Sequence, residues 1–374
     1  MSIFRTIAAT GLLAALSLPA AAQTASREFS VTSADGTAIN GQVDAPENAR
    51  RGAVILVAGT GLFDRDARFG RSGTPRDLLF ADLAQRINAR GLAAVRYDRR
   101  GVRHNVPVAE MLDTTVSGTS TTTSQREDLA AIYDWTRSRG GAGARCVVFL
   151  AHSEGLLHVA RLAESGAREP RAVIAIGGLL ESPLSVIRWQ MSGRDAYSLQ
   201  RMDSDGDGRV TNAEVEANLH NTPSSFADVL APFLQADGEW STEEIAQVAA
   251  IQTTLYDQQR DAALAQDDNA PYPNAATPMA RYSWWKSWFT DDISAASQLA
   301  RWRAPMIFHY GDKDSQTNHE RQRAAAGDLF GNRASFVIHA GRGHSLGEHA
   351  LWGPLDEALA EQIATEAALA CGGR

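Results

Sequence analysis

The chain has 374 residues, of which 44% are hydrophobic and 21% are charged, and its formal net charge at pH 7 is −8. An excess of acidic groups repels phosphate backbones and anionic lipid headgroups, which argues against a nucleic-acid or membrane partner. The length accommodates one large domain with an elaborate insertion.

Residues 1–22 have the plan of a secretory signal peptide. A single arginine, Arg5, precedes an apolar run over residues 7–18, and alanines occupy positions 20–22. The apolar run is too short for an ordinary membrane span. We therefore expect cleavage after Ala22 and export to the periplasm or the medium, with an uncleaved anchor as the alternative.

The next segments predict a β-hairpin and then an alternation of strands and helices. Residues 27–47 alternate polar and apolar residues around a turn at Asp35-Gly36. Short, uniformly apolar strands are predicted over 52–59, 92–98, 145–151 and 171–178, and amphipathic helices over 76–91, 124–141 and 155–166. This pattern is typical of a mostly parallel sheet with helices on both faces, an α/β fold.

The alternation stops near Leu184 and resumes after about Ala300. The intervening segment predicts helices and loops, whereas the C-terminal part predicts strands over 304–311 and 334–341 and helices over 319–330 and 354–370. The two flanks complete one another. We therefore expect a core formed by residues 23–183 and 301–374, with residues 184–300 inserted as a helical lid.

Ser153 lies where the third parallel strand runs into a helix, in the sequence Ala-His-Ser-Glu-Gly. A nucleophilic serine on such a tight turn needs small neighbours, here Ala151 and Gly155. It also needs a base and an acid that orients the base. Later strands are followed by "GDKD" and "GRGHS", which predict Asp314 as the acid and His344 as the base.

The sequence offers further acids, histidines and backbone groups for this site. Asp312 is the alternative acid, while His152, His339 and His349 are expected to be structural. An oxyanion hole needs two backbone N–H groups. We expect them from Glu154, which follows the serine, and from Thr60 in the glycine-containing loop after the first parallel strand, with Gly61 as the alternative to Thr60.

Five stretches of the chain resemble bacterial α/β-hydrolases of the serine-aminopeptidase-like and dienelactone-hydrolase-like group: residues 55–68, 94–102, 149–155, 287–292 and 310–317. The resemblance implies the α/β-hydrolase fold, a lid at the position of residues 184–300, carboxylesterase activity, and an acid at Asp314. Two features depart from the family pattern. Ala151 replaces the elbow glycine, and residues 100–105 replace Arg-Gly-x-Gly-x-Ser, which predicts altered packing near His104.

Residues 203–214 have the spacing of an EF-hand calcium loop. Carboxylates occupy positions 1, 3 and 5, glycine position 6 and a carboxylate position 12, and these hard oxygens suit calcium. The expected ligands are Asp203, Asp205, Asp207, the Arg209 carbonyl, Thr211 and Glu214. The alternative is an Asp/Gly-rich surface turn.

A degenerate second hand is expected over residues 233–244. Its Gly238, Trp240 and Glu244 fit positions 6, 8 and 12, but Phe233 and Gln235 cannot supply carboxylates at positions 1 and 3. It would pair with the first hand through position 8 without binding calcium strongly. The same stretch also reads as a plain helix start with a capping box.

Two further features of the sequence carry expectations. Cys146 begins a strand and Cys371 ends the last helix, so an antiparallel packing of that helix on the sheet would allow a disulfide; two free thiols are the alternative. Aromatic residues crowd positions 284–289, where they form either a substrate-pocket wall or the core of the lid.

The combined expectation is an exported serine hydrolase of carboxylic esters with a calcium-stabilised lid. A serine peptidase or amidase on the same fold is the first alternative, because the same triad serves both reactions. A calcium-binding protein on a non-catalytic hydrolase scaffold is the alternative from another class. The expected partner is a small-molecule ester or amide, and the oligomeric state is left open.

Overall fold

The computed structural model describes residues 24–47, 52–164, 166–218, 234–272 and 281–372. The expected signal peptide, residues 1–22, and the first residue of the expected second hand, Phe233, lie outside these ranges. No helix in the described ranges has both the length and the apolar character needed to cross a bilayer.

An eight-stranded sheet forms the centre of the core, in the order β1-β2-β4-β3-β5-β6-β9-β10. The β1–β2 and β2–β4 pairs are antiparallel and the other pairs are parallel. The predicted hairpin and the mostly parallel sheet are therefore confirmed. The strands are β1 (Thr24–Thr32), β2 (Ala38–Pro46), β3 (Gly52–Val57), β4 (Ala93–Tyr97), β5 (Cys146–His152), β6 (Ala172–Ile176), β9 (Met306–Gly311) and β10 (Ala334–His339).

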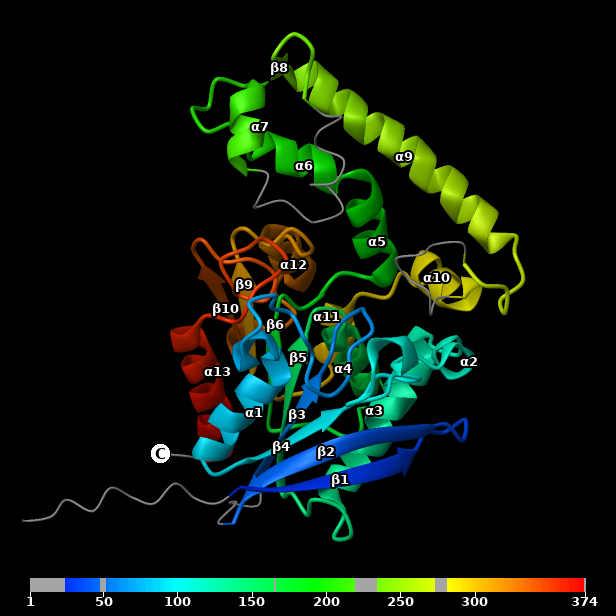
Figure 1. Cartoon of the computed structure of the whole chain (residues 1–374), viewed down its shortest axis with the longest axis vertical. Helices are drawn as coiled ribbons and strands as arrows, with labels where there is room; N and C mark the ends of the chain where they lie inside the picture. Colours follow the sequence, from blue (N-terminus) through cyan, green and yellow to red (C-terminus); the bar gives the residue numbers. More distant parts are fainter. Residues whose placement is uncertain (1–23, 48–51, 165, 219–233, 273–280, 373–374) are drawn as a thin grey trace, which may run out of the picture.

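Helices cover both faces of this sheet (Figure 1). Successive side chains of a strand point to opposite faces, so the uniformly apolar β3 contributes to two cores. Ile55 and Val57 pack with α3 and α4, whereas Val54 and Leu56 pack with α1 and α13. The core helices are α1 (Leu79–Ala89), α2 (Thr114–Ser117), α3 (Thr122–Arg137), α4 (Gly155–Ala163), α12 (His319–Ala326) and α13 (Glu357–Ala370), and the 3₁₀ turns are η1 (Pro75–Asp77), η2 (Val108–Glu110) and η5 (Gly331–Arg333).

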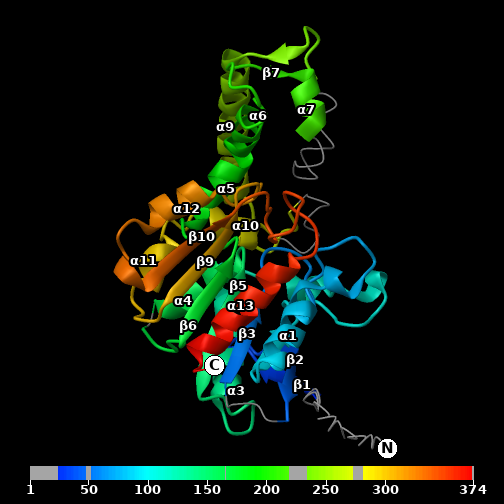
Figure 2. The same cartoon turned by 90° about the vertical axis from the view of Figure 1, so that its left-hand side faces the viewer.

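The segment between β6 and β9 stands beyond the carboxyl ends of the parallel strands (Figures 1 and 2). Its elements are α5 (Pro183–Ser192), α6 (Arg194–Gln200), β7 (Val210–Thr211), α7 (Asn212–Asn218), β8 (Glu239–Trp240), α9 (Thr242–Leu264), α10 (Tyr282–Phe289) and α11 (Ala295–Leu299). The last of these, α11, packs on α4 of the core. The core therefore resumes a few residues before position 301.

The aromatic residues of α10 are buried. Trp285 stacks on Tyr272 and on Phe289, and Phe289 meets the edge of Tyr256 from α9. These contacts favour the second of the two expectations for positions 284–289, in which the rings form the core of the lid where it joins the sheet.

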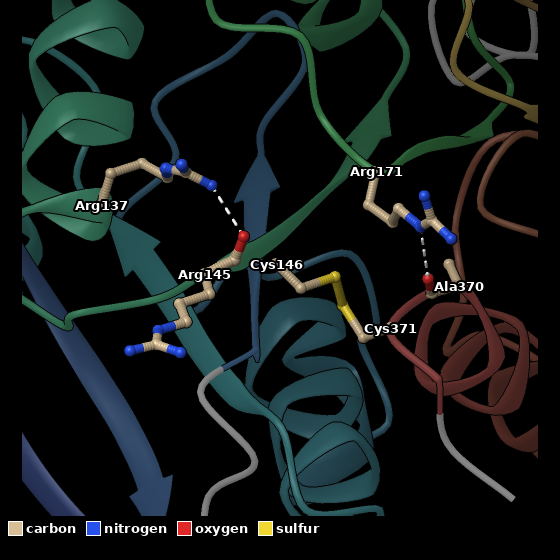
Figure 3. The surroundings of a disulfide bond; sticks show 6 residues. All are labelled: Arg137, Arg145, Cys146, Arg171, Ala370 and Cys371. Atoms are coloured by element: carbon tan, nitrogen blue, oxygen red, sulfur yellow. Dashed lines mark hydrogen bonds between the residues drawn. A yellow bond between two sulfur atoms is a disulfide. The ribbon is translucent and has the colours of Figure 1, made fainter.

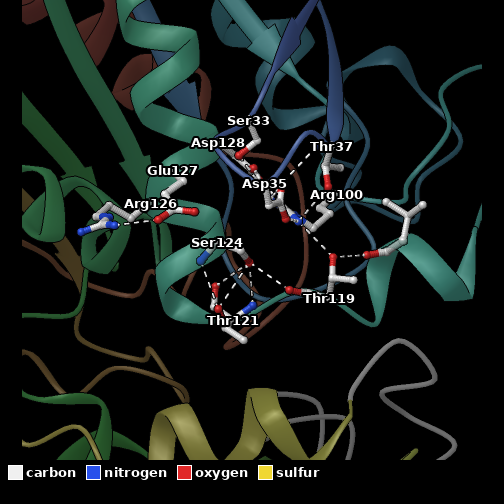
Figure 4. Close-up of polar contacts among 11 residues, drawn as sticks. Ser33, Asp35, Thr37, Arg100, Thr119, Thr121, Ser124, Arg126, Glu127 and Asp128 are labelled. Atoms are coloured by element: carbon white, nitrogen blue, oxygen red, sulfur yellow. Dashed lines mark hydrogen bonds and ion pairs between the residues drawn. The ribbon is translucent and has the colours of Figure 1, made fainter. Parts of the chain in front are cut away.

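A disulfide and a buried ion-pair cluster each join separate elements of the core. Cys146 at the start of β5 and Cys371 after α13 are joined by a disulfide, with their Cα atoms 5.8 Å apart (Figure 3). The buried Arg100 guanidinium pairs with Asp128 of α3 and with Asp35 in the hairpin turn, and it also donates to Thr37 (Figure 4). Arg100 thus ties the antiparallel hairpin to the helical layer.

Candidate active site

Ser153 occupies a sharp turn between β5 and α4, with φ of 54°. A left-handed conformation is strained for a residue with a side chain, and it lifts the serine out of the strand. The turn is packed so closely that a Cβ at Gly155 would lie 2.3 Å from the Val57 carbonyl. Ala151 is fully buried in β5, so the core has room for its methyl group at the position of the elbow glycine. The small-residue requirement inferred from the sequence is therefore met.

Asp314 and His344 form a buried pair on the loops after β9 and β10. His344 Nδ1 lies 2.8 Å from Asp314 Oδ2. The other oxygen, Asp314 Oδ1, accepts the backbone N–H groups of Gln316 at 2.7 Å and Thr317 at 2.8 Å. Because both carboxylate oxygens are engaged, the imidazole is held through Nδ1, which leaves Nε2 as the ring nitrogen able to act as a base.

The backbone at the end of β6 contacts both the serine turn and His344. The Ser153 amide donates to the Ile176 carbonyl at 3.0 Å. The next residue, Gly177, has φ of 55°, and a Cβ there would lie 2.8 Å from His344 Nδ1. The rings of His152 and His344 also meet edge to face at 4.7 Å. A glycine is thus required at position 177 for the imidazole to reach the serine turn.

The alternative acid and histidines are occupied elsewhere. Asp312 Oδ1 accepts the Gly341 amide at 2.7 Å, which joins the loop after β9 to the loop after β10. His339 pairs with His309 at 3.0 Å, and His349 Nδ1 accepts two backbone amides. Burial, together with the charge of His344, holds the pKa of His152 well below 6.5, so this ring is a neutral packing element of the turn.

The loop after β3 lies directly against the serine. A Cβ at Gly59 would come within 2.7 Å of Ser153 Cβ. Within the described part of the chain, the backbone N–H groups of Thr60 and Glu154 have no hydrogen-bond acceptor. Two uncommitted donors beside a strained serine are what an oxyanion hole requires.

The sequence pattern predicts the Glu154 amide as a donor but not the contacts of the Glu154 side chain or the presence of Arg99 in the site. The Glu154 side chain is fully buried, and its Oε2 accepts from Thr60 Oγ1 at 2.8 Å and from Arg99 Nη1 at 3.0 Å. A carboxylate placed between an apolar strand and an apolar helix has to find a buried counter-charge. The arginines that follow β4, Arg99 and Arg100, were the available signal for that partner.

The expected calcium loop folds back on itself at the tip of the lid. One oxygen each from Asp203, Asp205 and Glu214 lie within 4.8 Å of one another, whereas Asp207 is outside this group. Hydrogen bonds from Ser204 and Thr211 lower the pKa of Glu214 to about 2, so its carboxylate is ionised. Asp207 Oδ1 accepts the Arg209 amide, and the Arg209 side chain pairs with Glu239.

The second hand adjoins the first. Val210 pairs with Trp240 in the antiparallel β7–β8 ladder, at position 8 of both loops. The Asn212 side chain donates to the backbone carbonyl of Gln235, at position 3, and accepts from its backbone N–H, which ties the two stretches together. Glu244 Oε2 accepts the Ser241 amide and hydroxyl in a capping box that begins α9. The strand pairing at position 8 and the capping box are therefore both present in this stretch.

A cleft separates the lid from the acid loop. It is lined by residues of α5, α6, α7 and the link just before the calcium loop on one side and by the loop after β9 on the other, and these include Trp189, Tyr197, Met202, Asn218, Asp314 and Ser315. Asn218 ends α7, so the helices on both sides of the calcium loop contribute to the wall next to Asp314.

Comparisons with known proteins place the fold. No protein-family model and no curated protein matches the chain. Among solved structures, DcsB in complex with its substrate analogue is 15% identical, with a TM-score of 0.52, and the match covers 92% of this chain and 99% of that one. Est1E from Butyrivibrio proteoclasticus is 13% identical, with a TM-score of 0.50 and the same coverage. The chain has the α/β-hydrolase fold.

Proposed function

We propose that this protein is a serine hydrolase that acts on carboxylic esters. The observation that carries the proposal is the buried Asp314–His344 pair, whose imidazole packs on His152, the residue before Ser153 in its left-handed strand-to-helix turn. The order serine, acid, histidine along the chain, each at the carboxyl end of a parallel strand, supports it. The choice of esters follows the resemblance of residues 149–155 and 310–317 to carboxylesterase sequences.

In the proposed mechanism Ser153 Oγ attacks the ester carbonyl carbon while His344 Nε2 takes the hydroxyl proton. Asp314 holds the imidazole and stabilises its protonated form. The developing oxyanion is bound by the amides of Thr60 and Glu154. The C–O bond to the alcohol then breaks, and His344 returns the proton to the leaving alkoxide. Water, deprotonated by His344, hydrolyses the resulting acyl-enzyme by the same route and frees Ser153.

A fluorophosphonate probe tests the nucleophile directly. The mature wild-type protein should be labelled covalently and Ser153→Ala should not, with circular dichroism showing that both are folded. No labelling of the wild type, or equal labelling of the variant, would overturn the proposal. A wild-type protein that binds calcium but hydrolyses no member of a broad ester and amide panel would instead favour a calcium-binding protein on a non-catalytic scaffold.

Side-by-side turnover separates esters from amides. Short p-nitrophenyl acyl esters offer the triad an ester bond, and aminoacyl p-nitroanilides offer the same triad an amide bond. We expect kcat/KM for the preferred ester to exceed that for the amides. The opposite order would assign the protein to the peptidases or amidases.

The proposal includes a calcium ion that orders the lid. Asp203, Asp205 and Glu214 already converge, and the positive φ of Gly208, 85°, is the turn that an EF-hand needs at position 6. With Asp207, the Arg209 carbonyl and Thr211 they would supply a ligand set of hard oxygens. The ion would fasten α6 to α7 and so the lid wall of the cleft, and it takes no part in the chemical steps.

Export completes the proposed function. The Cys146–Cys371 disulfide suits an oxidising compartment, since such bonds are rare in the cytosol. It agrees with the signal peptide expected over residues 1–22. N-terminal sequencing of the protein recovered from the periplasm or medium should begin at Gln23, and an intact Met1 there would contradict cleavage.

A further inference from the structure

The strongest unexplained feature beside the site is a buried ion pair that touches both halves of the proposed oxyanion hole. Glu154 directly follows the nucleophile and is fully buried. Its partner Arg99 comes from the loop after β4 and is 7% exposed. An ion pair this deep rarely adds net stability, because desolvating both charges offsets their attraction. A contribution to stability alone therefore does not account for the Arg99–Glu154 ion pair.

The contacts of Arg99 reach both sides of the hole. Its Nη1 donates to Glu154 Oε2 at 3.0 Å and also to the Gly59 carbonyl, which belongs to the peptide group that carries the Thr60 N–H. The Arg99 backbone amide donates to the Phe63 carbonyl at 3.1 Å, further along the same loop. One residue thus holds the loop after β3 at two points.

Thr60 adds a direct link between the two halves. Its hydroxyl donates to Glu154 Oε2 at 2.8 Å, so the residue that supplies one amide is bonded to the side chain of the residue that supplies the other. Because Gly59 packs against Ser153, any rotation of the Gly59–Thr60 peptide would redirect its N–H away from the reacting carbonyl. Hydrogen-bond donors in such a hole act only when aimed at the oxyanion.

Glu154 stays ionised in this setting. Burial on its own would raise the pKa of Glu154, but the charge of Arg99 and the hydrogen bonds from Thr60 and Arg99 keep it below its usual value. The Glu154 carboxylate lies 3.7 Å from His158 Nε2. The Glu154 carboxylate therefore stays charged and accepts hydrogen bonds from both Thr60 and Arg99.

We infer that Arg99 and Glu154 are positioning residues that aim the Thr60 and Glu154 amides at the oxyanion. The inference rests on the proposed serine-hydrolase function and deepens it. Arg99 and the Glu154 carboxylate act through the Gly59–Thr60 peptide and the serine turn, and they do not touch the substrate. The signature of this role is a loss of transition-state binding without a matching loss of substrate binding.

The test compares Glu154→Gln and Arg99→Met with a matched control. Asp44→Asn removes the carboxylate from another buried arginine pair, Asp44–Arg96, which lies on β2 and β4. All variants are assayed on the preferred ester with the folded fraction set by circular dichroism. We expect kcat to fall about 10- to 100-fold for Glu154→Gln and Arg99→Met, with KM changed by less than about threefold, because small misplacements of catalytic groups have effects of this size. The control should keep its kcat.

A tetrahedral inhibitor gives a second readout. A trifluoromethyl ketone forms a hemiketal oxyanion on the serine, so its Ki should rise by the same factor as kcat falls in the two variants and stay constant in Asp44→Asn. Arg99→Lys, which keeps the charge, should recover part of the loss. Unchanged Ki and kcat in folded variants would overturn the inference.

Removal of a single partner leaves a buried charge unpaired, which can prevent folding. The double variant Arg99→Met/Glu154→Leu removes both charges and should fold. It should still show the reduced kcat and the weakened inhibitor; wild-type values in this variant would overturn the inference. Failure of the underlying function looks different, since the wild type itself would then be inert to the fluorophosphonate.

Discussion

His344 Nδ1 lies 2.8 Å from Asp314 Oδ2, and the remaining oxygen of that carboxylate is fixed by two backbone amides. The pair is buried, with Asp314 5% and His344 4% exposed. A carboxylate held from both sides permits one orientation of the imidazole. The neighbouring Asp312 points its carboxylate to the Gly341 amide instead, so the two aspartates of "GDKD" have separable roles.

Substitution of each aspartate should separate these roles. Asp314→Asn replaces the acceptor of the Nδ1 proton with an amide, and we expect kcat to fall about 10³- to 10⁴-fold, as for other triads that lose their acid. Asp312→Asn should lower kcat by less than about tenfold and act mainly on thermal stability. Ester turnover and melting temperature of both variants provide the check. Equal losses of kcat would contradict the assignment of Asp314.

The disulfide should stabilise the core without affecting the chemistry. Cys146 and Cys371 are 225 residues apart, and the bond lies at the amino-terminal end of β5, opposite Ser153 (Figure 3). A cross-link over a long loop restricts the unfolded chain. We expect Cys146→Ser/Cys371→Ser to lower the free energy of unfolding by about 2–5 kcal/mol, measured by urea denaturation, with kcat unchanged at 25 °C.

Dithiothreitol provides the control for the disulfide. It should destabilise the wild type by a similar amount and leave the double serine variant unaffected. If dithiothreitol leaves the free energy of unfolding of the wild type unchanged, the disulfide makes no contribution to stability. The same conclusion follows if the double serine variant is as stable as the wild type.

Most of the core could be predicted from the sequence because its signals are local. Uniformly apolar strands such as β3 and β5 are buried on both faces, and this leaves an unmistakable pattern. The ends of the helices were harder to predict. The helix expected over 319–330 ends at Ala326, because Gly327 adopts φ of 46° and terminates it, and α3 begins at Thr122, where Thr121 and Ser124 form a capping box.

Only those features of the site that depend on the order and spacing of residues along the chain could be predicted. Ser153, Asp314 and His344 each follow a recognisable strand, so their convergence follows from a parallel sheet. The Arg99–Glu154 contact joins residues from two different loops, and no periodicity encodes it. The same limit applies to the aromatic residues of α10, whose burial depends on α9 and Tyr272.

Calcium should stabilise the lid through the first hand alone. Extracellular modules often bind with Kd of about 10⁻⁴–10⁻³ M. At about 100 times Kd, mass action adds about 2.7 kcal/mol to the stability of the region that binds the ion. We expect added calcium to raise the melting temperature, and chelation to lower it together with activity, because the helices flanking the loop line the cleft beside Asp314.

Two variants locate the effect of calcium. Glu214→Gln removes the position-12 carboxylate and should abolish both the heat of calcium binding in calorimetry and the shift in melting temperature. Glu244→Gln changes the equivalent position of the second hand, where the carboxylate serves the capping box, and should preserve calcium binding. Chelation that alters neither melting temperature nor activity would exclude the proposed ion.

His158 should make the protein sensitive to mild acid. Burial is the main cause that lowers the pKa of His158 from 6.5 to about 4. The folded state therefore binds this proton less readily than the unfolded chain. Stability is fully retained above pH 6.5, and it falls as the pH drops toward 4, by up to about 3 kcal/mol for this group. The buried His152 acts in the same direction.

Replacement of His158 by phenylalanine tests the sign and the size of this effect. Neither ring nitrogen of His158 has a hydrogen-bond partner among the described residues, so the apolar ring should be accepted in the core. Urea denaturation of both proteins from pH 8 to pH 4 should give parallel curves above pH 6.5. Below it, His158→Phe should lose stability less steeply, and the remaining slope should come partly from His152. An unchanged slope would show that His158 binds its proton equally readily in the folded and the unfolded states.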